Sequence, residues 1–210
     1  KEHVNKLIKL SPTYKTTPNH NMGKIEYLKS PQPSMKFILD CENLKLKILA
    51  LRIYFDFDGS ISPIFKLKNK KDKKKNKIYR YNQIQFECNL RISETNPSLI
   101  KEFVLLCENC GIKAFIDKDK RNWSGIGGLR ISRIKDVLKF IEFGGPITNV
   151  RISSKSNRFT GKTKLSVCKT IKNILGSKIS KSYHFKDINN AVEKRGELNK
   201  LLISEIDKFN

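Results

Sequence analysis

Residues 78–92 read IYRYNQIQFECNLRI, and their alternation decides the fold. The apolar residues at every second position share one side of an extended strand: Ile84, Phe86, Cys88, Leu90 and Ile92. The intervening positions carry tyrosines, amides, a carboxylate and a guanidinium on the opposite side. The segment therefore predicts a long β-strand with one face in the core and one exposed polar face.

The residues before this strand predict a helix followed by the first half of a hairpin. Residues 41–57, CENLKLKILALRIYFDF, place apolar side chains around most of a helical circumference. We expect this helix to be buried against several neighbours and to end at Asp58-Gly59, where glycine adopts a helix-ending conformation. Residues 60–68 predict a strand, and residues 69–77, NKKDKKKNK, predict a basic exposed hairpin loop.

The residues after the long strand repeat the pattern. Residues 97–110 predict a helix, 112–118 and 123–132 predict two strands, and 134–143 predict another helix. The order over residues 41–145 is therefore α-β-β-α-β-β-α. This order predicts an α+β fold with one four-stranded antiparallel sheet, helices on a single face, and the other face bare and polar.

Composition divides the chain into three predicted parts. Residues 1–40 are rich in prolines and predict a connector or the tail of a preceding unit. Residues 41–150 form the α+β domain. Residues 151–210 predict a basic helical C-terminal extension with helices over 162–175 and 185–209, which is either an accessory DNA-binding element or a basic buttress.

The charge of the chain points to a polyanionic partner. The sequence carries 43 Lys and Arg against 20 Asp and Glu, a formal net charge of +23 over 210 residues. Such an excess predicts nucleic acid, although a lysine-rich source genome accounts for part of it. No apolar run reaches the roughly 18–20 residues of a membrane span, so we expect no membrane partner. We also expect no small-molecule substrate.

The five cysteines and the N-terminal sequence predict the compartment. An odd, scattered set of cysteines favours reduced thiols, and no signal peptide opens the chain. We therefore expect a cytoplasmic or organellar-matrix protein that is not secreted.

Two carboxylates mark a candidate metal site. The segment from 51 to 61, LRIYFDFDGSI, delivers Asp56 and Asp58 at the C-terminal end of an apolar helix, where the helix dipole disfavours anions. A divalent cation would compensate, and Mg²⁺ suits one or two carboxylates with water and phosphate oxygens. The alternative interpretation is that the two aspartates belong to a turn that ends the helix and bind no metal.

The stretch from Leu51 to Gly59 resembles the signature of the LAGLIDADG homing endonucleases, with matches at Leu51, Asp56, Asp58 and Gly59. The resemblance implies two such units, paired through their motif helices, with saddle-like sheets over the DNA major groove. It implies that Asp58 binds Mg²⁺ at the cleavage centre and that Asp56 is a structural neighbour. The basic residue that assists catalysis in this family is matched most nearly by Arg130.

The polar side of the long strand supplies the candidate DNA-reading residues. Amides and guanidinium groups read base edges in the major groove, and lysines bind phosphates. The candidates are Gln85, Asn89 and Arg91 for bases, Tyr79, Tyr81 and Gln83 as their neighbours, Lys66 and Lys68 for phosphates, and Arg130. The alternative is an ordinary solvated sheet face.

Two departures from the family motif keep a second function open. Ile53 and Phe57 stand where the family has small residues, and bulky side chains there separate paired helices. Either the partner, a second copy or a half encoded upstream of Lys1, compensates with small residues, or cleavage is lost. The leading expectation is a Mg²⁺-dependent endonuclease that cuts double-stranded DNA at a long site. The alternatives are a non-cleaving DNA-binding regulator or RNA splicing cofactor (maturase), and a basic RNA-binding or ribosome-associated protein.

Overall fold

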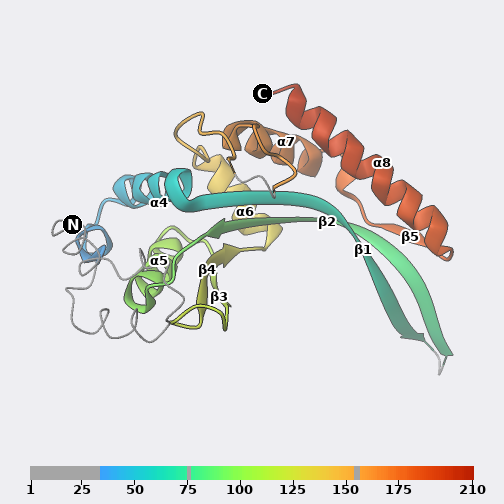
Figure 1. Cartoon of the computed structure of the whole chain (residues 1–210), viewed down its shortest axis with the longest axis horizontal. Coiled ribbons are helices and arrows are strands. Elements are labelled where there is room, and N and C mark those ends of the chain that lie inside the picture. Colours follow the sequence, from blue (N-terminus) through green and yellow to red (C-terminus); the bar gives the residue numbers. More distant parts are fainter. Residues whose placement is uncertain (1–33, 75–76, 154–156) are drawn as a thin grey trace. The chain divides into compact units, whose positions relative to one another are not determined.

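A computed structural model describes residues 34–74, 77–153 and 157–210 (Figure 1). The chain is mixed α+β with an antiparallel sheet. Its elements are α3 (Lys36–Leu39), α4 (Leu44–Asp58), β1 (Gly59–Lys74), β2 (Lys77–Ile92), α5 (Pro97–Asn109), β3 (Phe115–Lys118), β4 (Ile126–Ile131), α6 (Ile134–Glu142), α7 (Lys164–Gly176), the 3₁₀ turn η2 (Lys178–Ser180), β5 (Tyr183–Phe185) and α8 (Ile188–Asp207). From α4 to α6 the predicted α-β-β-α-β-β-α order is confirmed.

The sheet has one strand more than predicted. Its order is β1-β2-β4-β3, and β5 pairs separately with β2, so the described residues form five strands rather than four. β4 aligns Leu90 with Ile131, and β5 aligns Gln83 with His184, both in antiparallel register. A strand of three residues is too short to show a hydrophobic period, which is why residues 183–185 were not predicted as a strand.

The lysine-rich stretch predicted as a loop continues the first strand instead. β1 extends to Lys74 and β2 begins at Lys77, so the predicted loop over 69–77 is wrong for the residues described. The ladder between two strands is made by backbone groups, and it does not require apolar side chains. Lys70 and Lys71 are both exposed, so the strand continues there without burying lysine side chains.

Contacts within the chain define two compact units, and β1 and β2 contribute to both. The first unit comprises Lys1–Ser60 and Leu90–Ile131. In its described part, α5 packs on β3 and β4, and α3 and α4 pack beside α5 (Figure 1). Its core contains Leu51, Phe103 and Leu129, each almost fully buried. The predicted start of α5 is confirmed, because Pro97 opens the helix and the Asn96 side chain accepts bonds from the N–H groups of its first turn.

The second unit comprises Ile61–Asn89 and Ser132–Asn210. Here α7 packs against α6 and α8, and α8 packs against β5 (Figure 1). The predicted C-terminal helices are confirmed, and α8 runs without a break through Gly196. Phe65 of β1 and Phe86 of β2 pack together in the core of this unit, with ring centroids 5.1 Å apart.

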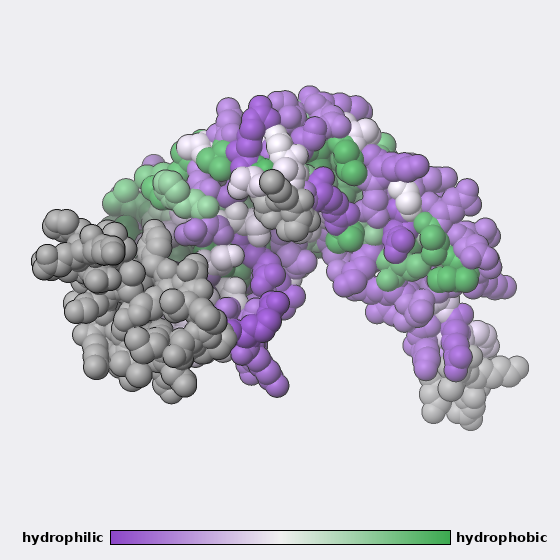
Figure 2. All heavy atoms as spheres, viewed as in Figure 1, coloured by the Kyte–Doolittle hydropathy of each residue, from purple (hydrophilic) through white to green (hydrophobic). Residues whose placement is uncertain are grey.

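The predicted end of α4 at Asp58-Gly59 is confirmed, and Gly59 is extended there, with φ −81° and ψ 146°. Glycine is needed at this position because a Cβ atom would lie 2.2 Å from the Phe55 carbonyl oxygen. The predicted burial of α4 against several neighbours is wrong for part of its surface: Ile53 is 40% exposed and Phe57 is 79% exposed, and hydrophobic residues gather on the surface over α4 in Figure 2.

The predicted connector or tail over residues 1–40 falls mostly on residues 1–33, which lie outside the described residues.

Candidate functional site

The two carboxylates of the candidate metal site lie in different environments. Asp56 is 5% exposed, whereas Asp58 is exposed to solvent at the last position of α4. Residues two positions apart on a helix point roughly 200° apart, so burial of one carboxylate leaves the other outside. The Asp58 carbonyl oxygen accepts a bond from the Ser93 N–H at 3.2 Å, which ties the helix end to the residue after β2. Only Asp58 therefore presents a carboxylate to an incoming ligand.

Acidic groups near Asp58 influence one another electrostatically. Burial raises the pKa of Glu94 and the Asp58 charge raises it further, although bonds from the Thr95 and Asn96 N–H groups lower it. Burial also raises the pKa of Tyr54, and the charges of Glu94, Glu102 and Asp58 act in the same direction. Burial is the largest cause of both shifts, and the carboxylate charges around Asp58 add to it in the same direction.

The polar side of the sheet in the first unit is organised by Asp117 of β3. Its carboxylate contacts the Arg91 guanidinium at 3.1 Å and the Arg130 guanidinium at 3.0 Å. Arg91 and Arg130 are register partners on β2 and β4, and both side chains are about half exposed. Two cations share one anion, so the cluster carries a net positive charge and holds both guanidinium groups in place. The structure therefore joins Arg130 to Arg91 through Asp117.

The second unit repeats this arrangement with lysines. Glu87 of β2 forms an ion pair with Lys68 and a longer one, at 3.9 Å, with Lys66, both from β1. One carboxylate again serves two cations, and Lys66 keeps more than half of its side chain exposed. The predicted amide readers of this unit are all partly exposed on β2: Gln83, Gln85 and Asn89.

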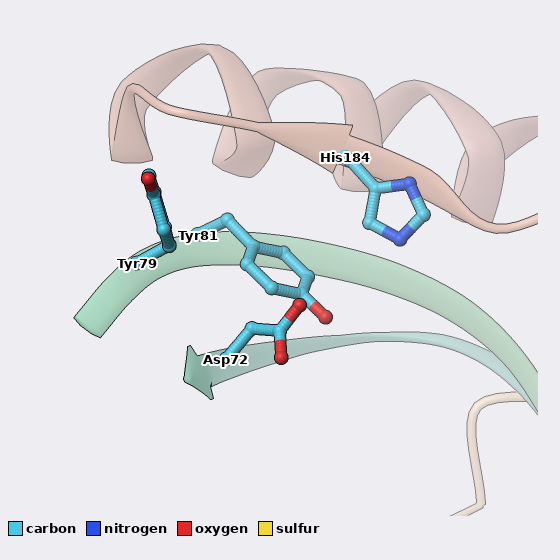
Figure 3. A pocket seen from close by; sticks show the side chains of 4 residues that line it. All are labelled: Asp72, Tyr79, Tyr81 and His184. Atoms are coloured by element: carbon cyan, nitrogen blue, oxygen red, sulfur yellow. The ribbon is translucent and has the colours of Figure 1, made fainter. Parts of the chain in front are cut away.

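The two predicted tyrosines line a pocket in the second unit. Tyr79 and Tyr81 of β2 meet Asp72 of β1 and His184 of β5 around a cavity of about 420 Å³ (Figure 3). The rings of Tyr81 and His184 lie edge to face, with centroids 5.3 Å apart. In the view of Figure 3, Tyr79 and His184 flank the Tyr81 ring, and Asp72 approaches it from the neighbouring strand.

Several residues of these clusters were not predicted as site residues. Glu87 occupies an outward position in the alternating segment, so its place could be predicted, but its lysine partners depend on the register of β1. Asp117 lies on a four-residue strand with a bulge at Asp117/Lys118, which the sequence does not reveal. His184 reaches the tyrosines only because β5 joins the sheet. Glu94 shows no sequence signal beyond its position before α5.

No family model, no curated protein and no solved structure matches the chain. Among the residues the structure describes, no helix is both long enough and apolar enough to cross a membrane. The same residues form no cluster of three or more His, Cys, Asp or Glu side chains suited to a metal ion. The function of the protein is therefore inferred from its own side chains.

Proposed function

We propose that the chain is a site-specific endonuclease of the LAGLIDADG type that binds double-stranded DNA and hydrolyses its phosphodiester bonds with Mg²⁺. The observation that carries the proposal is the pair of register partners Arg91 and Arg130, held half-exposed on adjacent strands by Asp117. Two guanidinium groups with fixed spacing on a polar sheet face suit the major groove of DNA.

Recognition divides between the two kinds of cation. Arg91 and Arg130 donate to guanine edges or phosphates, whereas Lys66 and Lys68 supply positive charge to the phosphate backbone. Gln83, Gln85 and Asn89 offer amides that pair with adenine. Because Asp117 and Glu87 each hold two cations, the cations meet DNA already oriented, which lowers the entropic cost of binding.

Asp58 is the residue that would hold Mg²⁺. Its exposed carboxylate fits a hard cation, and this chain supplies one such carboxylate at the end of α4. Bound there, Mg²⁺ would activate water and stabilise the leaving oxygen of the scissile phosphate. Asp56 is buried, so its carboxylate is not presented to a metal ion in solution. Arg130 can offset phosphate charge but cannot transfer a proton, because guanidinium does not deprotonate in proteins.

The exposed apolar face of α4 supports a paired arrangement. Its exposed apolar residues are Leu44, Leu46, Leu49, Ile53 and Phe57. Leu46, Leu49, Ile53 and Phe57 lie within about 80° of one another around the helix, whereas Leu44 lies on the opposite side. An exposed apolar face of this kind is typical of a packing surface. A second copy, or a second half in the same polypeptide, would cover it and bring a second carboxylate beside Asp58.

The proposal is tested by selecting cleavage sites from a randomised plasmid library with Mg²⁺ or with EDTA. Asp58→Asn is compared with Asp40→Asn, which removes an exposed carboxylate at the end of α3. We expect Mg²⁺-dependent cuts at one long site with the wild type and Asp40→Asn, and none with Asp58→Asn. Cleavage that persists in Asp58→Asn would reject the assigned metal ligand.

A specific observation favours a second candidate, a non-cleaving DNA-binding regulator or splicing cofactor. Ile53 and Phe57 project from the motif helix as bulky exposed side chains, which would separate paired helices and misplace Asp58. Salt-sensitive binding to duplex DNA without cleavage would favour this candidate. Stronger binding to structured RNA than to duplex DNA would indicate an RNA-binding role instead.

A further inference from the structure

We propose that the pocket formed by Asp72, Tyr79, Tyr81 and His184 binds a nucleobase that has left its stack, so that the protein recognises nucleic acid at an unpaired or extruded nucleotide. This inference deepens the proposed function and rests on nucleic-acid binding, but it concerns a different site from Asp58 and the arginine cluster. We call these four residues the aromatic pocket.

The strand register places the aromatic pocket on the polar side of the sheet in the second unit. His184 is the register partner of Gln83, and paired residues of antiparallel strands point to the same side. Tyr79, Tyr81 and Gln83 occupy every second position of β2, so their side chains point to the same side of the sheet. The pocket therefore lies on the same side as Gln83, an amide already proposed to meet DNA.

The shape and surface of the aromatic pocket suit a flat heterocycle. Three rings from two strands line an open pocket of about 420 Å³, within the usual size range for small-ligand sites. Tyr79 is 51% exposed, so its ring is accessible to a stacking partner. Asp72 and His184 add polar atoms at the wall, where they can meet amino and ring nitrogen groups on a base edge (Figure 3).

The positive charge around the pocket favours a nucleotide over a cationic ligand. Aromatic rings beside a carboxylate can also hold an alkylammonium ion. Here Lys70 of β1 is exposed two residues before Asp72, on the same side of the strand, and the chain carries +23 overall. This positive charge repels an ammonium ion and attracts the phosphates on either side of a base.

The base must be outside a regular stack. In a paired duplex both faces of each base are covered by its neighbours, so a protein ring can stack only on a base that is bulged, frayed or extruded. Stacking of a base on an aromatic side chain changes binding by about 5- to 150-fold when the ring is removed. The expected ligand is therefore a strand with one unstacked nucleotide.

The test uses the full chain and three oligonucleotides that carry the fluorescent base 2-aminopurine: a duplex with it as a single-nucleotide bulge, a fully paired duplex, and a single strand. We expect tighter binding to the bulged duplex than to the paired one, by about tenfold, with a fluorescence change on binding. Tyr81→Leu should lose the preference and the fluorescence change, and Tyr81→Phe should keep both. Circular dichroism and thermal unfolding that match those of the wild type in both variants control for folding.

The outcomes separate this inference from the proposed function. Equal affinity for bulged and paired duplexes, or a preference that survives in Tyr81→Leu, would overturn the proposal that the aromatic pocket binds a nucleobase. Neither result would affect the proposal that the protein binds duplex DNA. Fluorescence changes on the single strand that depend on Tyr81, without binding to the paired duplex, would support the pocket and reject the duplex endonuclease. Absence of binding to all three oligonucleotides would overturn both.

Discussion

The side chain of Asn199 pairs with both backbone groups of Phe65. Its Oδ1 accepts the Phe65 N–H at 3.1 Å, and its Nδ2 donates to the Phe65 carbonyl at 3.0 Å. β1 is an edge strand in the described sheet, so these groups have no neighbouring strand on that side. One amide of α8 thereby takes the place of a strand partner and ties the C-terminal helix to the sheet.

This relationship predicts that Asn199→Ala destabilises the protein by about 1–3 kcal/mol, because it leaves a backbone donor and acceptor without their partner. Asn199→Asp should also destabilise, since a carboxylate cannot donate to the Phe65 carbonyl. Urea unfolding measures both effects. Asn189→Ala, at an exposed position near the start of the same helix, is the matched control and should be near neutral.

The parts of the fold that the sequence predicts are those with a local period. The alternation over 84–92 and the apolar period over 97–110 are local signals, and both strand and helix form as expected. The lysine stretch of β1 was predicted incorrectly because a long two-stranded ladder continues beyond the core that stabilises its base. The exposure of α4 depends on what covers the helix, which an apolar pattern does not specify.

The candidate site is less predictable than the fold. The outward residues of β2 could be chosen by alternation, but their partners come from strands far along the chain. Arg130 meets Asp117 because β3 and β4 pair across a bulge, and Tyr81 meets His184 because β5 adds to the sheet. The assignment of these residues to DNA stays a prediction that binding experiments must test.

Glycine is required at residue 59 and not at residue 196. A Cβ at Gly59 would lie 2.2 Å from the Phe55 carbonyl oxygen, so Gly59→Ala should destabilise by more than about 2 kcal/mol. A Cβ at Gly196 meets no atom within 4 Å, and this residue lies inside α8. Gly196→Ala should therefore stabilise by about 0.5–1 kcal/mol through helix propensity. Thermal unfolding of the two variants should show opposite shifts, and a neutral Gly59→Ala would contradict the close approach.

The arginine pair predicts a defined change in the salt dependence of DNA binding. If Arg91 and Arg130 each neutralise a phosphate, replacing either by Ala should reduce the magnitude of the negative slope of log K against log salt by about one unit. If an arginine reads guanine instead, its replacement should relax specificity at one position and leave the slope nearly unchanged. Arg195→Ala, exposed on α8, is the control and should change neither quantity. Fluorescence anisotropy titrations at several salt concentrations distinguish these outcomes.

Removing the shared carboxylate tests how the arginines are held. Asp117→Asn deletes an anion between Arg91 and Arg130, so non-specific DNA affinity at low salt should rise. Discrimination between specific and non-specific DNA should fall, because the guanidinium groups lose their fixed orientation. An unchanged ratio of the two affinities would show that Asp117 does not position the arginines. Both affinities are measured by competition with unrelated duplex DNA.

Glu94 predicts how stability depends on pH. Burial, together with the Asp58 charge, raises its pKa in the folded state above the ordinary 4.5, so the folded protein retains a proton that the unfolded chain releases. Its contribution is most favourable below pH 4.5 and is lost as pH rises through the raised folded-state value. Glu94→Gln keeps an oxygen that can accept the Thr95 and Asn96 N–H bonds, so the variant should gain stability relative to the wild type as pH rises. Urea unfolding between pH 4 and pH 8 measures the difference. Asp58→Asn should shrink it, because that substitution removes a charge that raises the Glu94 pKa. A pH-independent difference would contradict the raised pKa of Glu94, and a difference that Asp58→Asn leaves unchanged would contradict the coupling of the two carboxylates.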